Sequence, residues 1–158
     1  QSNADEELIG GLHHVVNDIE RLGDYSMLLF KETNDMKKKE LYFSEETKEE
    51  LEQIYTLISN MFDLGFETLS TREIDNFQKI ANVQKEIKQL ISKTRKEHVV
   101  RLNSKVYPAA LSKNIYSVLI SLQRVSEHFL NISFSIRSTT GDEEEALQAF
   151  ELETNVIS

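Results

Sequence analysis

Apolar residues recur every three or four positions along most of this chain, which is the spacing of one face of an α-helix. Four segments show this pattern: residues 5–36, a segment from Ser44 to Leu69, one from Ser70 to beyond Val99, and residues 109–137. In the first segment one apolar stripe is formed by Leu8, Leu12, Val15, Val16, Ile19, Leu22 and Leu29. Because the 158 residues include one proline and five glycines, long helices are favoured over a β fold with many turns.

Polar and helix-breaking residues mark where these helices begin and end. Ser44, followed by two glutamates, fits the N-cap of the second helix, and Ser70 with Glu73 fits a capping box for the third. Pro108 separates the third helix from the fourth, and Gly141 follows the end of the fourth. Short connections between long amphipathic helices make neighbours antiparallel. The sequence therefore predicts an all-α fold, an antiparallel helical bundle of four long helices.

The chain divides into three regions. Residues 1–4, Gln-Ser-Asn-Ala, resemble the remnant of a cleavable expression tag. Residues 5–139 form the predicted bundle, and residues 140–158 form an acidic tail that fits a short docking helix through Ala146, Leu147, Phe150 and Leu152. Since the sequence after the tag begins inside a helix and without a start methionine, we expect a domain cut from a longer protein.

Charge and composition narrow the function. The formal net charge of −9 argues against non-specific binding to nucleic acid, and the lack of cysteine excludes thiolate catalysis and thiolate metal sites. No apolar run approaches the roughly 18 residues needed to cross a bilayer, so we expect a soluble fragment. No nucleophile, base and oxyanion-hole set is recognisable, and no Glu is followed three residues later by His as in di-iron bundles. We therefore expect a protein that is not an enzyme.

An acidic and arginine-containing motif occurs twice. The first copy is Asp18-Ile-Glu-Arg-Leu-Gly-Asp24, and the second, imperfect copy is Leu122-Gln-Arg-Val-Ser-Glu127. The offset between the arginines is 103 residues (124 minus 21), and the apolar positions of the two helices coincide at that offset. The copies also share a small residue and a following acid, which matching apolar stripes alone would not produce: Gly23 with Ser126, and Asp24 with Glu127.

This motif resembles the signature of the phosphate-uptake regulator (PhoU) family. The wider run from residue 13 to residue 25 is most similar to the PhoU-like domain at the C-terminus of sodium/phosphate cotransporter-type membrane proteins. The family is built from tandem three-helix repeats, each closing with the motif helix. The resemblance thus implies one complete repeat, preceded by the last helix of another.

The resemblance also implies a function. It indicates a non-catalytic regulatory domain at the cytoplasmic face of the cell membrane, which modulates phosphate transport through the membrane transporter portion of the same polypeptide. One alternative is a freestanding PhoU-type adaptor that contacts a phosphate ATP-binding-cassette transporter and a sensor kinase. Another is a metal-binding helical protein. The presence of a hydrophobic multi-span region upstream of Asp5 in the parent gene would separate the first two.

The motif acids suggest a metal site. Glu20 and Asp24 lie four residues apart on one helix face, with Cβ atoms roughly 6 Å apart, and the resemblance implies that such acids hold iron or zinc clusters. In the second copy Glu127 keeps one acid, but Gln123 replaces the other, so that site is incomplete. Oxygen ligands alone favour a hard divalent metal, with iron also compatible.

A structural interpretation of the same residues competes with the metal site, and we favour it. Asp18, Arg21 and Arg124 would form an ion-pair cluster between helices, in which Arg21 binds Glu127 and Arg124 binds Asp24. Gly23 and Ser126 would allow the helices to approach closely. His98 and His128 are expected at helix surfaces or boundaries. If earlier helices are missing, the first helix keeps exposed apolar surface, so we also expect a homodimer.

Overall fold

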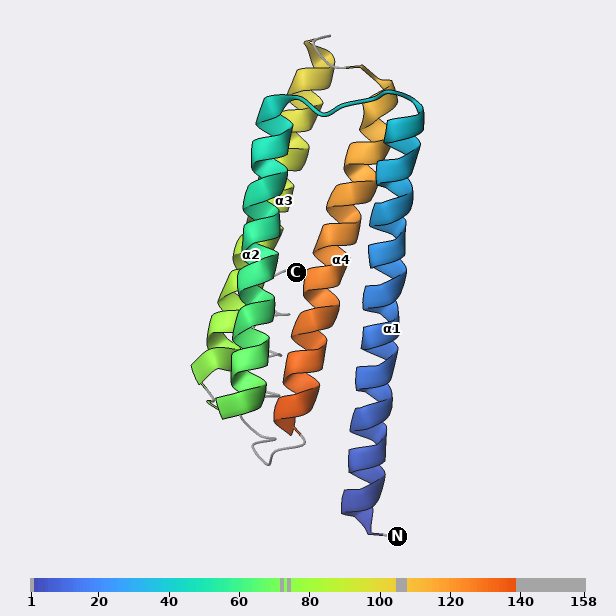
Figure 1. The fold of residues 1–158 in the computed structure, drawn as a ribbon. Coiled ribbons are helices and arrows are strands. Elements are labelled where there is room, and N and C mark those ends of the chain that lie inside the picture. Colours follow the sequence, from blue (N-terminus) through green and yellow to red (C-terminus); the bar gives the residue numbers. More distant parts are fainter. Residues whose placement is uncertain (1, 72, 74, 105–107, 139–158) are drawn as a thin grey trace.

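The computed structural model describes residues 2–71, 73, 75–104 and 108–138, and these form four long helices (Figure 1). They are α1 (Asn3–Lys38), α2 (Glu45–Thr71), α3 (Asp75–Asn103) and α4 (Ala110–Ser138). The described residues include no strand, which confirms the predicted all-α bundle of four helices. None of these helices combines the length and apolar character needed to cross a membrane.

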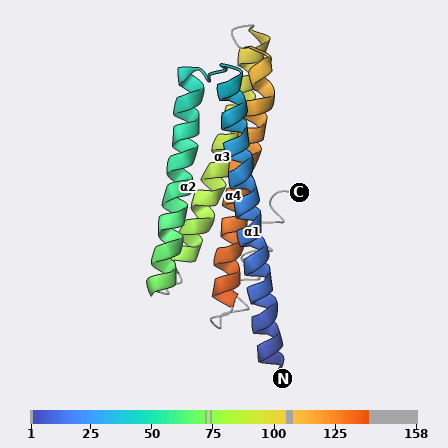
Figure 2. The same ribbon diagram turned by 45° about the vertical axis from the view of Figure 1, so that its right-hand side comes forward.

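The helices pack as a three-helix unit with a fourth helix on one side. α2 packs against α3, α3 against α4, and α2 also touches α4, whereas α1 packs along α4. Within the described residues α1 makes no comparable contact with α2 or α3, although α2 follows it in the chain. Figures 1 and 2 show α1 running antiparallel to α4 along the outside of the unit.

The centre of the hydrophobic core lies inside the three-helix unit. Its fully buried large side chains are Ile54 and Met61 of α2, Ile80, Ile87 and Ile91 of α3, and Leu111, Ile115 and Leu119 of α4. From α1 the core includes one buried residue, Met36. Most of the predicted stripe of α1 stays exposed or partly exposed because this helix has one neighbour instead of two.

The helix boundaries follow the predicted signals with one exception. The Thr47 backbone N–H donates to Ser44 Oγ (3.3 Å), as expected of an N-cap, and Leu111 N–H donates to the Pro108 carbonyl (3.0 Å) at the start of α4. The predicted cap at Ser70 is wrong, because α2 continues to Thr71 and the Ser70 hydroxyl donates back to the Phe66 carbonyl (3.2 Å). The predicted tail, residues 140–158, lies outside the described residues.

Candidate functional site

The two helices that carry the motif copies, α1 and α4, pack together and are linked by Asp18 of the first copy and by His128, the residue after the second copy. His128 Nδ1 lies 2.7 Å from Asp18 Oδ1, and the His128 ring stacks on Tyr25 with centroids 5.8 Å apart and planes at 23°. The same antiparallel register brings Asn114 of α4 to Glu32 of α1, with Nδ2 donating to Oε2 over 2.7 Å. Leu22 of α1 and Val125 of α4, the residues that correspond at the offset of 103, belong to the same hydrophobic cluster. The repeated motif thus marks an interface within the chain.

Asp18 and His128 are positioned to stay bonded in either charge state of the imidazole. Their side chains keep only 17% and 21% of their surface exposed. A carboxylate can only accept, so the Nδ1–H donates to it whether the ring is neutral or protonated. His128 is therefore a partly buried link between helices, where the sequence suggested a surface residue.

The motif arginines bind differently from the predicted cluster. Arg124 Nη1 donates to Glu127 Oε2 (2.8 Å) within α4, and Gln123 Nε2 donates to the other oxygen of Glu127 (2.9 Å). Arg124 thus has Glu127 as its partner instead of Asp24, because an acid three residues away can be reached without crossing to another helix. Arg21 and Asp24 are exposed, and Arg21 forms no ion pair with any other described residue.

The predicted metal ligands are not gathered by the fold. Glu20 and Asp24 are exposed on α1, and Glu127 is already bonded by Gln123 and Arg124. Among the described residues, no three His, Asp or Glu side chains come together in a way that could hold a metal ion. The metal site at Glu20, Asp24 and Glu127 therefore stays a prediction.

The close approach between helices occurs at a glycine that the motif does not contain. A Cβ on Gly23 would meet nothing within 4 Å, so the part of the chain that the structure describes offers no packing reason for this glycine. A Cβ on Gly65 would lie 2.3 Å from Cζ of Phe129, where α2 touches α4. Ser126, by contrast, is fully buried, and its hydroxyl donates to the Gln123 carbonyl (2.6 Å).

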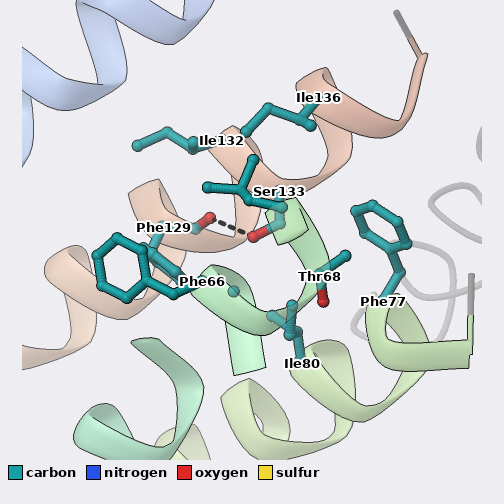
Figure 3. A pocket seen from close by; sticks show the side chains of 10 residues that line it. Phe66, Thr68, Phe77, Ile80, Phe129, Ile132, Ser133 and Ile136 are labelled. Atoms are coloured by element: carbon teal, nitrogen blue, oxygen red, sulfur yellow. Dashed lines mark hydrogen bonds between the residues drawn. The ribbon is translucent and has the colours of Figure 1, made fainter. Parts of the chain in front are cut away.

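An apolar pocket lies between the C-terminal ends of α2 and α4 and the start of α3 (Figure 3). Its open volume is about 340 Å³, and its lining is Gly65, Phe66, Thr68, Leu69, Phe77, Ile80, Phe129, Ile132, Ser133 and Ile136. Both hydroxyls in this lining are used by their own helices, since Thr68 donates to the Leu64 carbonyl (2.6 Å) and Ser133 to the Phe129 carbonyl (3.0 Å). The lining thus provides apolar contact and lacks the converging polar groups that orient a substrate.

A polar cluster lies at the opposite end of the bundle. Arg101 of α3 donates from Nη1 to Thr47 Oγ1 (3.0 Å) and Glu50 Oε2 (3.1 Å) of α2, and from Nη2 to both Glu50 and Glu97. Burial raises the pKa of Glu50, while the Arg101 guanidinium opposes that rise. This cluster was not predictable from the sequence, because Glu50 and Arg101 are separated by 51 residues.

His98, beside this cluster, is buried rather than on the surface. Its side chain has no exposed area, its Nε2 lies 3.3 Å from Ser112 Oγ of α4, and its ring contacts Tyr116 edge to face at 5.4 Å. Burial lowers the pKa of His98, and the positive charge of Arg101 adds to this effect. The arrangement joins α3 to α4.

Comparison with protein families, curated proteins and solved structures finds no match to this chain. A family assignment therefore rests on the motif residues and on how the fold arranges them. In that arrangement, the motif carboxylates either bond to neighbouring helical side chains or face solvent.

Proposed function

We propose that this chain is a non-catalytic regulatory domain of a sodium-dependent phosphate cotransporter-like membrane protein, which modulates phosphate transport from the cytoplasmic face of the membrane. The observation that carries the proposal is the packing of the two helices that carry the motif copies, α1 and α4, which are joined by Asp18 of the first copy and by His128, the residue after the second copy. Tandem three-helix repeats that each end in a motif helix would pack their last helices together. Here α2, α3 and α4 would be one repeat, and α1 the last helix of the preceding one.

The packing of α1 supports a role in transmission rather than in chemistry. A signal can pass through a helix that shifts as a body, and such a shift is easiest where the helix has a single neighbour. Within the described residues α1 packs along α4 alone, and polar contacts link the two helices near the middle and near one end. A change at the transporter that moved α1 would have to break the Asp18–His128 and Glu32–Asn114 contacts as well as the apolar packing on α4.

Phosphate uptake by cells that express the native full-length protein tests this proposal. We expect uptake of radiolabelled phosphate to require sodium, and the paired substitution Asp18→Ala with His128→Ala to change its rate at equal protein level in the membrane. Asp63→Ala, at an exposed acid of α2, serves as the control and should transport like the wild type. Uptake without sodium dependence would overturn the transporter assignment, and unchanged uptake in the paired variant would overturn the regulatory role of this interface.

A further inference from the structure

Helix α1 carries two heptad seams, and α4 covers one of them. The covered seam alternates spacings of four and three residues, and all its side chains are partly or fully buried: Asp18, Leu22, Tyr25, Leu29, Glu32 and Met36. A second seam is displaced from the first by one residue, which is about 100° round the helix, so that Ile19 follows Asp18 and Gly23 follows Leu22. It has the same alternation of three and four: Ile9, Leu12, Val16, Ile19, Gly23, Ser26 and Phe30.

The second seam is exposed along its whole length. Its large side chains each keep more than half of their surface accessible: Ile9 60%, Leu12 54%, Val16 60%, Ile19 54% and Phe30 62%. Contiguous apolar surface of this kind marks an interaction site. Because a heptad repeat is the spacing by which helices interlock their side chains, the partner that fits this seam is another helix.

Gly23 gives the seam a place for close approach. A glycine inside a helix costs about 1 kcal/mol relative to alanine, and Gly23 lies in the middle of a helix of 36 residues with nothing within 4 Å of its Cβ position. The next seam residue, Ser26, donates its hydroxyl to the Leu22 carbonyl of its own helix (2.8 Å), so it needs no polar partner. These two small residues leave room for the bulky side chains of an approaching helix.

We propose that this seam is a homodimer interface, in which the α1 helices of two copies pack antiparallel. Residues of two antiparallel heptad helices pair in layers. In one register, almost the whole length of α1 in one copy lies alongside α1 of the other copy. Each layer of that register joins a residue of one copy to a residue of the other: Ile19 to Gly23, Val16 to Ser26, Leu12 to Phe30, and Ile9 to Thr33. Two of these layers therefore place a β-branched side chain against one of the small residues.

Charge selects the antiparallel orientation. The seam continues to Asp5 in the first turn of α1 and to Lys37 in its last turn, and the same register pairs these two residues at both ends of the dimer. A parallel pair would instead place Asp5 beside Asp5 and Lys37 beside Lys37. Like charges side by side disfavour that arrangement, so the end charges specify orientation even where they add little affinity. The dimer rests on α1 alone and concerns the chain as given, because under the proposed function the other helices of the preceding repeat would compete for the same seam.

The molar mass of the chain tests the dimer. In light scattering over a micromolar to submillimolar concentration series, we expect the wild type to have the mass of two chains and Ile19→Glu the mass of one. Tyr55→Glu removes an equally exposed apolar residue of α2, outside the seam, and should remain a dimer. Circular dichroism of both variants shows whether the helices are kept. A single-chain mass for the wild type throughout, or a dimer that survives Ile19→Glu, would overturn the proposal.

Disulfide trapping tests the orientation. The chain has no cysteine, so introduced thiols are its only thiols. Ile9→Cys combined with Thr33→Cys should give a covalent dimer on oxidation, whereas either single variant should not. Within one helix the two positions are about 36 Å apart, far beyond the reach of a disulfide. Covalent dimers of the Ile9→Cys single variant would indicate parallel helices, and no covalent dimer of the double variant would exclude this register.

Discussion

Asp18 Oδ1 and His128 Nδ1 lie 2.7 Å apart although 110 residues separate them in the chain. Each belongs to one of the two helices that carry the repeated motif, so this contact fixes the register of α1 on α4. A hydrogen bond with a charged partner contributes about 1.5–3 kcal/mol where it is shielded from water. Because both side chains are largely buried, the contact is a main polar determinant of how α1 sits on the three-helix unit.

Gly65→Ala is expected to destabilise the bundle, because the new Cβ would lie 2.3 Å from Cζ of Phe129. The Phe129 ring is itself held edge to face against Phe62, with centroids 4.3 Å apart, so it cannot move without loss of packing. Overpacking of this kind costs about 1–3 kcal/mol. Urea unfolding measures the cost, and Gly10→Ala, at an open position of α1, is the matched control. Equal stability of the two variants would contradict the close contact between α2 and α4.

His98 is expected to make the bundle less stable at acidic pH. Burial lowers the pKa of His98 in the folded state, so below about pH 6.5 the unfolded chain binds a proton that the folded chain excludes. The free energy of unfolding should therefore fall as the pH decreases below that value. Unfolding curves between pH 5 and 8 should show a smaller slope for His98→Gln than for the wild type. His13→Gln, at an exposed histidine, should keep the wild-type slope.

Glu50→Gln is expected to raise the free energy of unfolding slightly at neutral pH. Burial raises the pKa of Glu50, so the folded chain favours a neutral group over the carboxylate at this position, and Arg101 keeps Thr47 and Glu97 as partners. As the pH falls below the ordinary pKa of a glutamate, the wild-type carboxyl becomes neutral like Gln, and the difference should disappear. Chemical unfolding at two pH values measures this change. Glu49→Gln, at the exposed neighbour, should have little effect at either pH.

Helix positions were predictable from the sequence, because periodicity and capping act locally. Ser44 caps the second helix as predicted. The cap predicted at Ser70 was wrong, because the Ser70 hydroxyl bonds within the preceding helix and that helix continues past it. Contacts between residues that are far apart in the sequence were harder to predict. The sequence predicted Asp24 as the partner of Arg124, whereas the fold shows that Arg124 bonds to the nearer acid, Glu127.

The two histidines His98 and His128 also show that burial was hard to predict from the sequence. His98 and His128 look alike in sequence, each on a helix and each next to a glutamate. One is fully buried between α3 and α4, and the other bonds to Asp18 of α1. Which face of a helix is covered depends on how many neighbours that helix has, and this is a property of the whole bundle. For the same reason, the stripe of α1 predicted from periodicity is real, but much of it is exposed.

The claim that the contact between Asp18 and His128 joins α1 to the three-helix unit is tested most directly by a double-mutant cycle. The free energy of unfolding is measured for the wild type, Asp18→Ala, His128→Ala and the double variant at pH 7. We expect the sum of the losses in the two single variants to exceed the loss in the double variant, with a coupling energy of about 1–2 kcal/mol between the side chains. Losses that add within about 0.3 kcal/mol would contradict the claim, because residues that do not interact are independent.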